Sequence, residues 1–444
     1  MNTERIGGSG WVARLNTESR RRGMITALAL GLIAAVGFAV YAPSLGGPFL
    51  WDDVNLIRDN THLTQPGELG RLLTQPIGSG SGMPYTFYRP VQMLAYRLDI
   101  LLGGLNPRGF HVSSVLTHVL VAWALFGLVH TLGGDRRTAL FAALLFVVHP
   151  LHTEAVAYIA GRADPLAALF LLTALILAIR TRPPSAHPPR AAVLGLYALA
   201  ILSKESSLIF PAVLLVHAAA FRRRPDARLF AGLLLMSAAY VALRLTVLRA
   251  WIVYEPAQGT AAQRLPGFLA ALAAYARLLV VPRNLHMEYG FRLFDGSHPS
   301  VWIGGCLLAG AIGWLAVRRQ GRAVFAVAWF LVTLLPVSNV YLINAFMAEH
   351  WLYLPSIGFC LWLADAPRVL ARTPRGRAAA GVVLSAWLVW LAAGTIRQSG
   401  IWSDPVRLYE HTLRLAPESH TARINLALAL QDQGRDDEIG RAHV

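Results

Sequence analysis

Two adjacent acidic residues, Asp52 and Asp53, form the first pair in the sequence that could do acid–base chemistry. Neighbouring carboxylates repel one another unless a metal ion, an arginine or a shared proton offsets their charge. A carboxylate that faces a bound substrate can accept the proton of an incoming hydroxyl group and make it a better nucleophile. Both residues are therefore candidate general bases, and the sequence leaves open which of them acts. The alternative is a solvated turn, where Asp is common.

The sequence also contains cationic side chains that could bind a phosphate group. Lys204 is the only lysine among the 40 residues counted as Lys or Arg, so it is a candidate for a site that needs an ammonium group. The alternative is that the single lysine stands at this position by chance. Arginine binds phosphate oxygens with two hydrogen bonds and lysine binds them as a point charge. We therefore predict that Arg89, Arg162 and Lys204 bind a phosphate.

Imidazole and carboxylate groups near these cations could hold a divalent cation. His152, Glu154 and Glu205 are candidate ligands for Mn or Mg, or groups that orient the phosphate-bearing substrate. The metal stays an open question. A helix cap formed by the histidines, and structural ion pairs that involve Arg162 with Asp164 or Glu205 with its neighbour, are the alternatives. The cysteines lie in apolar runs and supply neither a disulfide framework nor a metal-ligand spacing.

The composition predicts a membrane protein. The 444 residues are 55% hydrophobic and 14% charged, and mean hydropathy is +0.48. Soluble domains carry about 25% charged residues, so an ordinary cytosolic enzyme is excluded. The net charge of +16 invites a nucleic-acid partner. We reject that partner because the arginines form short clusters between apolar runs, as in the cytoplasmic loops of membrane proteins.

The apolar runs predict an all-α polytopic protein with about eleven transmembrane helices. The runs are 24–42, 111–132, 138–148, 165–179, 191–202, 208–221, 229–248, 301–317, 323–335, 351–364 and 378–396. Run 268–281 contains Arg277, which would cost about 2.5–3.5 kcal/mol at the bilayer centre, so we expect an interfacial or re-entrant helix. All arginine clusters then lie in the cytoplasm, with the N-terminus inside and the C-terminus outside. No signal-peptide cleavage site follows the first run.

This topology places the polar groups together on the outer side of the membrane. Carboxylates, imidazoles and the single lysine fall there, whereas the inner loops contain mostly arginine and proline. Glycosyl transfer from a lipid-linked phosphosugar needs a base for the acceptor, and positive charge or a metal for the departing phosphate. The outer side offers both.

Motifs in this order resemble those of the GT-C glycosyltransferases, and in particular the transmembrane and tetratricopeptide-repeat (TPR) O-mannosyltransferase-like proteins. The segments that carry the resemblance are Phe49-Leu50-Trp51-Asp52-Asp53 with Tyr88-Arg89-Pro90, the stretches 149–156 and 161–164, Leu202-Ser203-Lys204-Glu205, and 352–356 with Gly358. The resemblance implies a GT-C arrangement, a polyprenyl-phosphate-linked sugar as donor, transfer on the outer face, and a catalytic acidic pair at Asp52 and Asp53.

The C-terminal part resembles the start of a TPR array. Residues 421–438 are similar to a first TPR helix, and about three or more repeats are needed for stability. We expect a cytoplasmic segment 1–23, a transmembrane domain 24–397 with outer regions 43–110 and 249–300, and a periplasmic TPR-like region 398–437. Residues 438–444 match a translated sequencing adapter, so we expect the native sequence to end near Asp437 and further repeats to be missing.

The leading hypothesis is a glycosyltransferase of a bacterial inner membrane that transfers a sugar, mannose first among the candidates. Its partners would be the lipid-linked donor, a polypeptide or glycan acceptor, and membrane lipid. A secondary transporter or flippase is the alternative from another class, although transporters place their ion sites near the membrane midplane. A non-catalytic TPR scaffold is the other alternative, and it would have no need of Asp52, Asp53 or Lys204.

Overall fold

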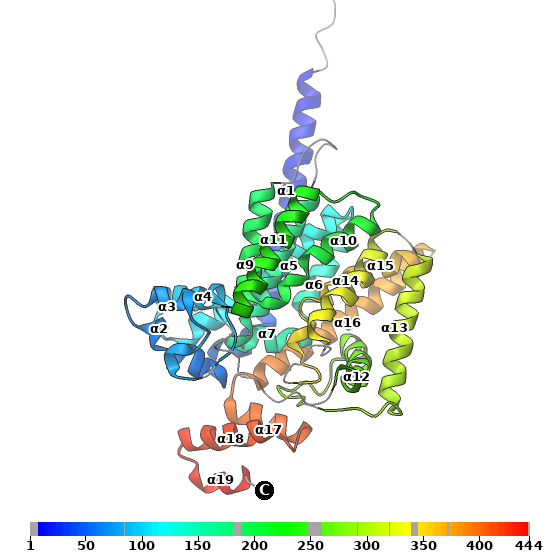
Figure 1. Ribbon diagram of the computed structural model, residues 1–444. Coiled ribbons are helices and arrows are strands. Elements are labelled where there is room, and N and C mark those ends of the chain that lie inside the picture. The colour runs from blue at the N-terminus through cyan, green and yellow to red at the C-terminus, as the bar shows by residue number, and fades with distance from the viewer. Residues whose placement is uncertain are drawn as a thin grey trace, which may run out of the picture.

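The computed structural model describes residues 8–83, 85–180, 189–246, 260–290, 292–318, 320–338, 345–370 and 373–442. Within these ranges the chain is helical and contains no strand, which confirms the all-α prediction (Figure 1). The predicted outer region 249–300, the N-terminal segment 1–23 and the last segment 438–444 each lie partly outside the described residues.

Every apolar run predicted to cross the membrane forms a helix. These helices are α1 (Gly8–Tyr41), α5 (Pro107–Thr131), α6 (Arg136–Val147), α8 (Ala163–Ile179), α9 (Arg190–Ser203), α10 (Phe210–Ala220), α11 (Ala227–Thr246), α13 (Pro299–Val317), α14 (Arg322–Leu334), α15 (Ser356–Leu370) and α16 (Pro374–Ile401). The run predicted at 351–364 becomes a helix only from Ser356, directly after Pro355. Proline lacks the N–H that a helix interior needs.

Six helices of the described chain are long and apolar enough to cross a membrane, and a seventh span is possible if α6 and the segment Pro150–Ala157 count as one. That pair is bent by 52°. Helices α9, α10, α14 and α15 are shorter apolar helices. A helix of 11 residues such as α10 extends only about 16 Å, about half of the hydrocarbon core. The predicted count of about eleven spans is therefore not confirmed.

The centre of the bundle is formed by α5, α6 and α8, whose apolar side chains belong to the largest buried cluster. By contrast, only 17%, 11% and 11% of the membrane-length windows of α1, α13 and α16 are buried. Their exposed large residues include Leu28, Trp302 and Val382. Apolar helices that are exposed on their outer sides are expected where lipid surrounds a bundle.

Helix α12 (Ala261–Val280) contains the run that we predicted not to cross, and it is not among the six candidate spans. In Figure 1 it is seen nearly end-on beside α13, which runs up the page. The two helices approach closely at Gly304, where a Cβ atom would lie 1.8 Å from the carbonyl oxygen of Leu269. Only glycine allows that approach.

The first loop and the C-terminal helices lie at the same end of the molecule, opposite the start of α1 (Figure 1). The loop contains α2 (Thr61–Thr64), α3 (Leu69–Thr74) and α4 (Pro90–Gly103). The C-terminal helices are α17 (Pro405–Leu415), α18 (His420–Asp432) and α19 (Asp436–Ala442). A buried cluster that includes Leu50, Trp402 and Leu430 joins the two regions. Helices α17 and α18 pack on each other, but a TPR arrangement is not confirmed.

Candidate functional site

A strained turn presents the acidic pair. Trp51 has a φ of 45°, a left-handed conformation that a bulky side chain rarely adopts. Its ring stacks on Tyr158, with ring centroids 5.8 Å apart, and Tyr158 stacks in turn on Trp402 at 5.5 Å. This aromatic stack holds the turn against the end of α16. Such outliers cluster at functional sites, where the surrounding structure maintains them.

Asp52 is half-buried, and two tyrosine hydroxyl groups hold its carboxylate. The hydroxyl of Tyr158 donates to Oδ2 at 2.9 Å and that of Tyr85 donates to Oδ1 at 3.2 Å. Burial raises the pKa of Asp52 above its usual range, and the two tyrosine hydrogen bonds oppose that rise. A partly exposed carboxylate with a raised pKa is well suited to act as a general base.

Asp53 is fully enclosed, and its carboxylate accepts hydrogen bonds from the backbone. Its Oδ1 accepts a hydrogen bond from the N–H of Ala160 at 2.7 Å, and its Oδ2 accepts one from the N–H of Leu50 at 3.1 Å. Burial raises the pKa of Asp53 to about 8 against the effect of these two donors. Since both oxygens are occupied and the residue is 0% exposed, Asp53 clamps the turn to the 159–162 segment. The two acidic residues thus differ in solvent exposure: Asp52 is half-buried and Asp53 is fully buried.

Arg162 lies beneath this clamp rather than in the open. It forms an ion pair with Asp99, and its Nε and Nη2 atoms donate to Ser114 Oγ at 3.0 Å and to the carbonyl of Phe110 at 2.6 Å. The predicted alternative pairing of Arg162 with Asp164 is wrong, because Asp99 takes that place. The residue is 1% exposed, and its guanidinium ties the 159–162 segment to α4 and α5.

The other two predicted phosphate ligands meet at one point in the bundle. Arg89, just before α4, forms a two-pronged pair with Glu205 at 3.0 and 2.7 Å. Lys204 donates to both oxygens of Asp164 at 2.7 and 2.6 Å. Because Lys204 and Glu205 are adjacent, both pairs lie side by side at the turn between α9 and α10. The predicted local pair of Lys204 with Glu205 is replaced by these long-range partners.

A buried hydroxyl group completes this ionic cluster. Tyr240 of α11 is 6% exposed, and its hydroxyl has no hydrogen-bond partner within the described residues. It lies near enough to Glu205, Arg244 and Arg89 to interact with them electrostatically. Arg244 also donates to the carbonyl of Thr86 at 2.8 Å, which joins α11 to the first loop. A buried polar group without a partner needs an explanation, such as a ligand.

The predicted divalent-cation ligands do not form one site. Both ring nitrogens of His152 are used, by the carbonyl of Phe146 at 2.8 Å and by Ser356 Oγ at 2.9 Å. Glu154 binds the N–H and the ring of His350 at 2.9 and 2.8 Å. Within the described ranges, no group of three or more His, Cys, Asp or Glu residues could hold a metal ion. These side chains therefore do not fit the predicted metal site.

Comparison with known proteins gives the relatives of the chain. No protein-family model matches it. The protein O-mannosyl-transferase F38B6.6 of Caenorhabditis elegans is 27% identical over 428 residues, which cover 91% of this chain and 60% of the relative. The human protein O-mannosyl-transferase TMTC1 is 28% identical, and the match covers 99% of this chain and 57% of that protein. The chain resembles the protein O-mannosyl-transferases. The resemblance predicted from the motifs is confirmed.

The fold also has a match among solved structures. The crystal structure of the Archaeoglobus fulgidus oligosaccharyltransferase, tethered to an acceptor peptide, has a TM-score of 0.51 and 13% identity, and the match covers 84% of this chain and 55% of that one. The predicted GT-C fold is confirmed at this level, and the chain is an integral membrane protein. It spans 57% to 60% of the length of the two O-mannosyl-transferases described above.

Several residues of the candidate site were not predicted from the sequence. Tyr85 and Tyr158, which hold Asp52, carry no distinctive spacing, and Tyr240 and Arg244 lie in an apolar run that was interpreted only as a span. Gly161 was recognised as part of a motif, but the sequence did not explain why that position is a glycine. A Cβ atom there would lie 2.6 Å from the carbonyl oxygen of Glu154, so the motif needs glycine for close backbone approach.

Replacing Tyr85 with phenylalanine should move the acidic limb of the activity profile to higher pH. The hydroxyl of Tyr85 lowers the pKa of Asp52, so its loss raises that pKa further. If Asp52 acts as the base, activity falls as the pH drops through its pKa, and the variant should lose activity at a higher pH than the parent. The measurement is the rate of sugar transfer against pH.

Tyr88→Phe is the matched control, because its hydroxyl donates to the carbonyl of Leu73 and does not contact Asp52. Its profile should coincide with that of the parent. Equal profiles for Tyr85→Phe and the parent would mean that Asp52 does not set the acidic limb.

Proposed function

We propose that the chain is the membrane part of a glycosyltransferase that transfers a sugar, with mannose as the first candidate, from a polyprenyl-phosphate donor. The acceptor is a hydroxyl group of a protein or glycan on the outer face of the membrane. The observation that carries this proposal is the half-buried carboxylate of Asp52 at the strained Trp51 turn. The similarity to protein O-mannosyl-transferases along most of the chain supports the sugar and the reaction class.

In the proposed reaction, Asp52 accepts the proton of the acceptor hydroxyl as its oxygen attacks the anomeric carbon of the sugar. The bond between that carbon and the phosphate oxygen breaks, and the polyprenyl phosphate departs with the bonding electrons. The general base makes the hydroxyl a better nucleophile only in the transition state, which is where it accelerates the reaction. Asp53 keeps the turn in place.

Arg89 and Lys204 are the proposed ligands of the donor phosphate. Their partners, Glu205 and Asp164, hold both cations at one place and leave part of their hydrogen-bonding capacity unused. The free hydroxyl of Tyr240 near Arg89 supports an anionic ligand at this cluster. Arg162, which is enclosed and paired with Asp99, has a positioning role instead.

Sugar transfer in proteoliposomes tests the function. The purified chain is reconstituted and supplied with radiolabelled polyprenyl-phosphate-mannose, polyprenyl-phosphate-glucose or GDP-mannose, together with a Ser/Thr-rich polypeptide or a glycan acceptor. We expect label in the acceptor only from a lipid-linked donor. A folded protein that moves label across the bilayer without transferring it would favour the flippase, and one that does neither would favour the scaffold.

A further inference from the structure

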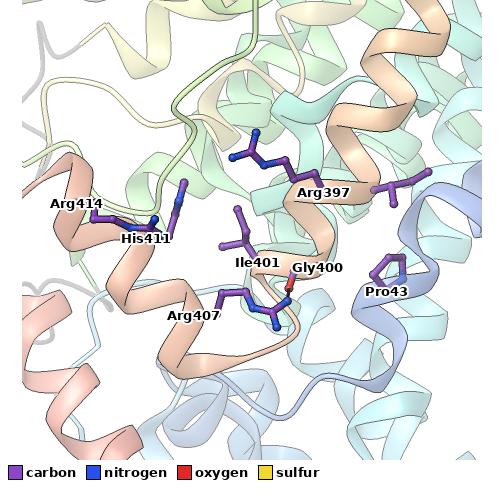
Figure 2. A pocket seen from close by; sticks show the side chains of 8 residues that line it. Pro43, Arg397, Gly400, Ile401, Arg407, His411 and Arg414 are labelled. Atoms are coloured by element: carbon purple, nitrogen blue, oxygen red, sulfur yellow. Dashed lines mark hydrogen bonds between the residues drawn. The ribbon is translucent and has the colours of Figure 1, made fainter. Parts of the chain in front are cut away.

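A second cluster of positive charge lies at the junction of α16 and α17. A cavity of about 450 Å³ opens there between the last turns of α16, the face of α17 and Pro43. Figure 2 shows Arg397 from α16 and Arg407, His411 and Arg414 from α17 around the same space. The three residues of α17 are separated by four and three positions, so they share one face of the helix.

The positive charge of this cavity has no counter-charge among the described residues that line it. No acidic residue is among the described residues that line it, and none of its arginines forms an ion pair with a described carboxylate. Arg407 donates to the carbonyl of Gly400 at 3.2 Å, and Arg414 to the carbonyl of Glu410 at 3.4 Å. The remaining guanidinium donors are available to a ligand, since each arginine carries five.

His411 contributes shape rather than charge. Its Nε2 atom lies 2.8 Å from the carbonyl oxygen of Leu285, where it can donate a hydrogen bond. Burial lowers the pKa of His411, and Arg414 and Arg397 lower it further, so the imidazole is neutral near pH 7. The positive charge of the cavity therefore belongs to the arginines.

The cavity lies at one boundary of the candidate membrane spans. The window that contains α1 ends at Gly46, just beyond Pro43, and the span of α16 ends at Ile401. Both helices carry other arginines at their opposite ends, at 20–22 and at 375 and 377. Topology alone can explain those arginines, but Arg397, Arg407 and Arg414 stand at the other boundary. Beside them, Ile396 is 45% exposed and offers an apolar surface toward the membrane.

We propose that this cavity binds the anionic phosphate headgroup of a membrane lipid at that boundary. Guanidinium groups bind phosphate oxygens with paired hydrogen bonds, so three of them around one cavity suit a phosphate headgroup. Ile396, Ile401 and Pro43 would contact the first carbons below the headgroup. The bound lipid would join the end of α16 to α17, and the site does not depend on the sugar-transfer reaction.

Native mass spectrometry of the purified, delipidated chain in detergent tests the proposal with phosphatidic acid as the probe. The test variant is Arg397→Gln/Arg414→Gln, because neither side chain donates to a residue outside its own helix within the described part. The control, Arg318→Gln/Arg375→Gln, removes two exposed arginines elsewhere, so it has the same net charge as the test variant. We expect the test variant to bind phosphatidic acid at least about tenfold more weakly, and the control to bind it like the parent.

Binding measurements with other probes show whether the cavity prefers a lipid phosphate or free phosphate. Phosphatidylcholine should bind much more weakly than phosphatidic acid, and inorganic phosphate should bind more weakly than the lipid. Tight binding of inorganic phosphate alone would overturn the assignment to a lipid. Equal loss in the control variant, or no loss in the test variant, would overturn the site. Thermal unfolding of each variant without lipid checks that it is folded, and Arg397→Lys, which keeps the charge, should retain most of the binding.

Discussion

Sugar transfer by an Asp52→Asn variant should be about 10²–10⁴-fold slower than transfer by the parent, because a general base contributes roughly that factor. Asparagine has nearly the same shape and can still accept a hydrogen bond from Tyr158 or Tyr85, but it cannot take a proton. The loss should therefore appear in kcat, with the thermal unfolding temperature close to that of the parent. The measurement is initial rate against acceptor concentration in proteoliposomes, with unfolding followed in parallel.

Asp53→Asn is the informative comparison, since it changes the adjacent residue by the same chemistry. Asp53 accepts one backbone N–H on each oxygen, and asparagine would present an N–H₂ group to one of these donors. We expect a loss of about 1–3 kcal/mol in the free energy of unfolding, which is the cost of an unsatisfied buried polar group. Full activity in Asp52→Asn together with a folded but inactive Asp53→Asn would reverse our assignment of the base.

The difference between the two aspartates illustrates what the sequence can predict here. Adjacent carboxylates in a polar loop can be recognised in the sequence, and they predict a candidate site at Asp52 and Asp53. Which one is enclosed depends on Leu50 and Ala160, and the latter is 107 residues away from Asp53. A contact of that separation leaves no local pattern. The same holds for the tyrosines that hold Asp52, because aromatic residues near a membrane surface are common for other reasons.

The positions of the helices were predictable for a simpler reason. A segment such as Pro107–Thr131 is predominantly apolar, and a backbone in lipid must satisfy its own hydrogen bonds, so a helix follows. The number of spans was not predictable in this way. Helix α10 is as apolar as α13 but contains only 11 residues, and whether a short helix crosses depends on the helices around it.

The ion pairs were the least predictable part, although their residues were all recognised. Lys204 and Arg162 were predicted to bind a phosphate, and local ion pairs with Glu205 and Asp164 were the alternative. Instead, each finds its partner on another helix or loop: Asp164 for Lys204, Arg89 for Glu205, and Asp99 for Arg162. Buried charges must be paired, so the packing of distant segments determines the partners. Two of these pairs connect the first loop to other segments, Arg89 to Glu205 and Asp99 to Arg162, and the third joins Lys204 to Asp164 of α8.

Replacing Arg162 with leucine should lower the free energy of unfolding by about 3–5 kcal/mol, because it leaves the carboxylate of Asp99 buried without a cation. It also removes the donors to Ser114 and to the carbonyl of Phe110. The measurement is reversible unfolding in mixed micelles. The control is Arg58→Leu, which breaks an exposed pair with Asp59 and should cost less than about 1 kcal/mol.

A double variant, Arg162→Leu/Asp99→Leu, should recover part of the loss, since replacing both members of a buried pair with apolar groups is often neutral. Recovery would be incomplete because Ser114 and the carbonyl of Phe110 remain without their donor. The sequence-based assignment of Arg162 to the donor phosphate makes a different prediction: a raised KM for the donor in a variant as stable as Arg58→Leu. That result would return Arg162 to the binding site, whereas a large loss of stability would support a structural role. In that role Arg162 ties the 159–162 segment, which includes the Ala160 N–H bound by Asp53, to α4 and α5.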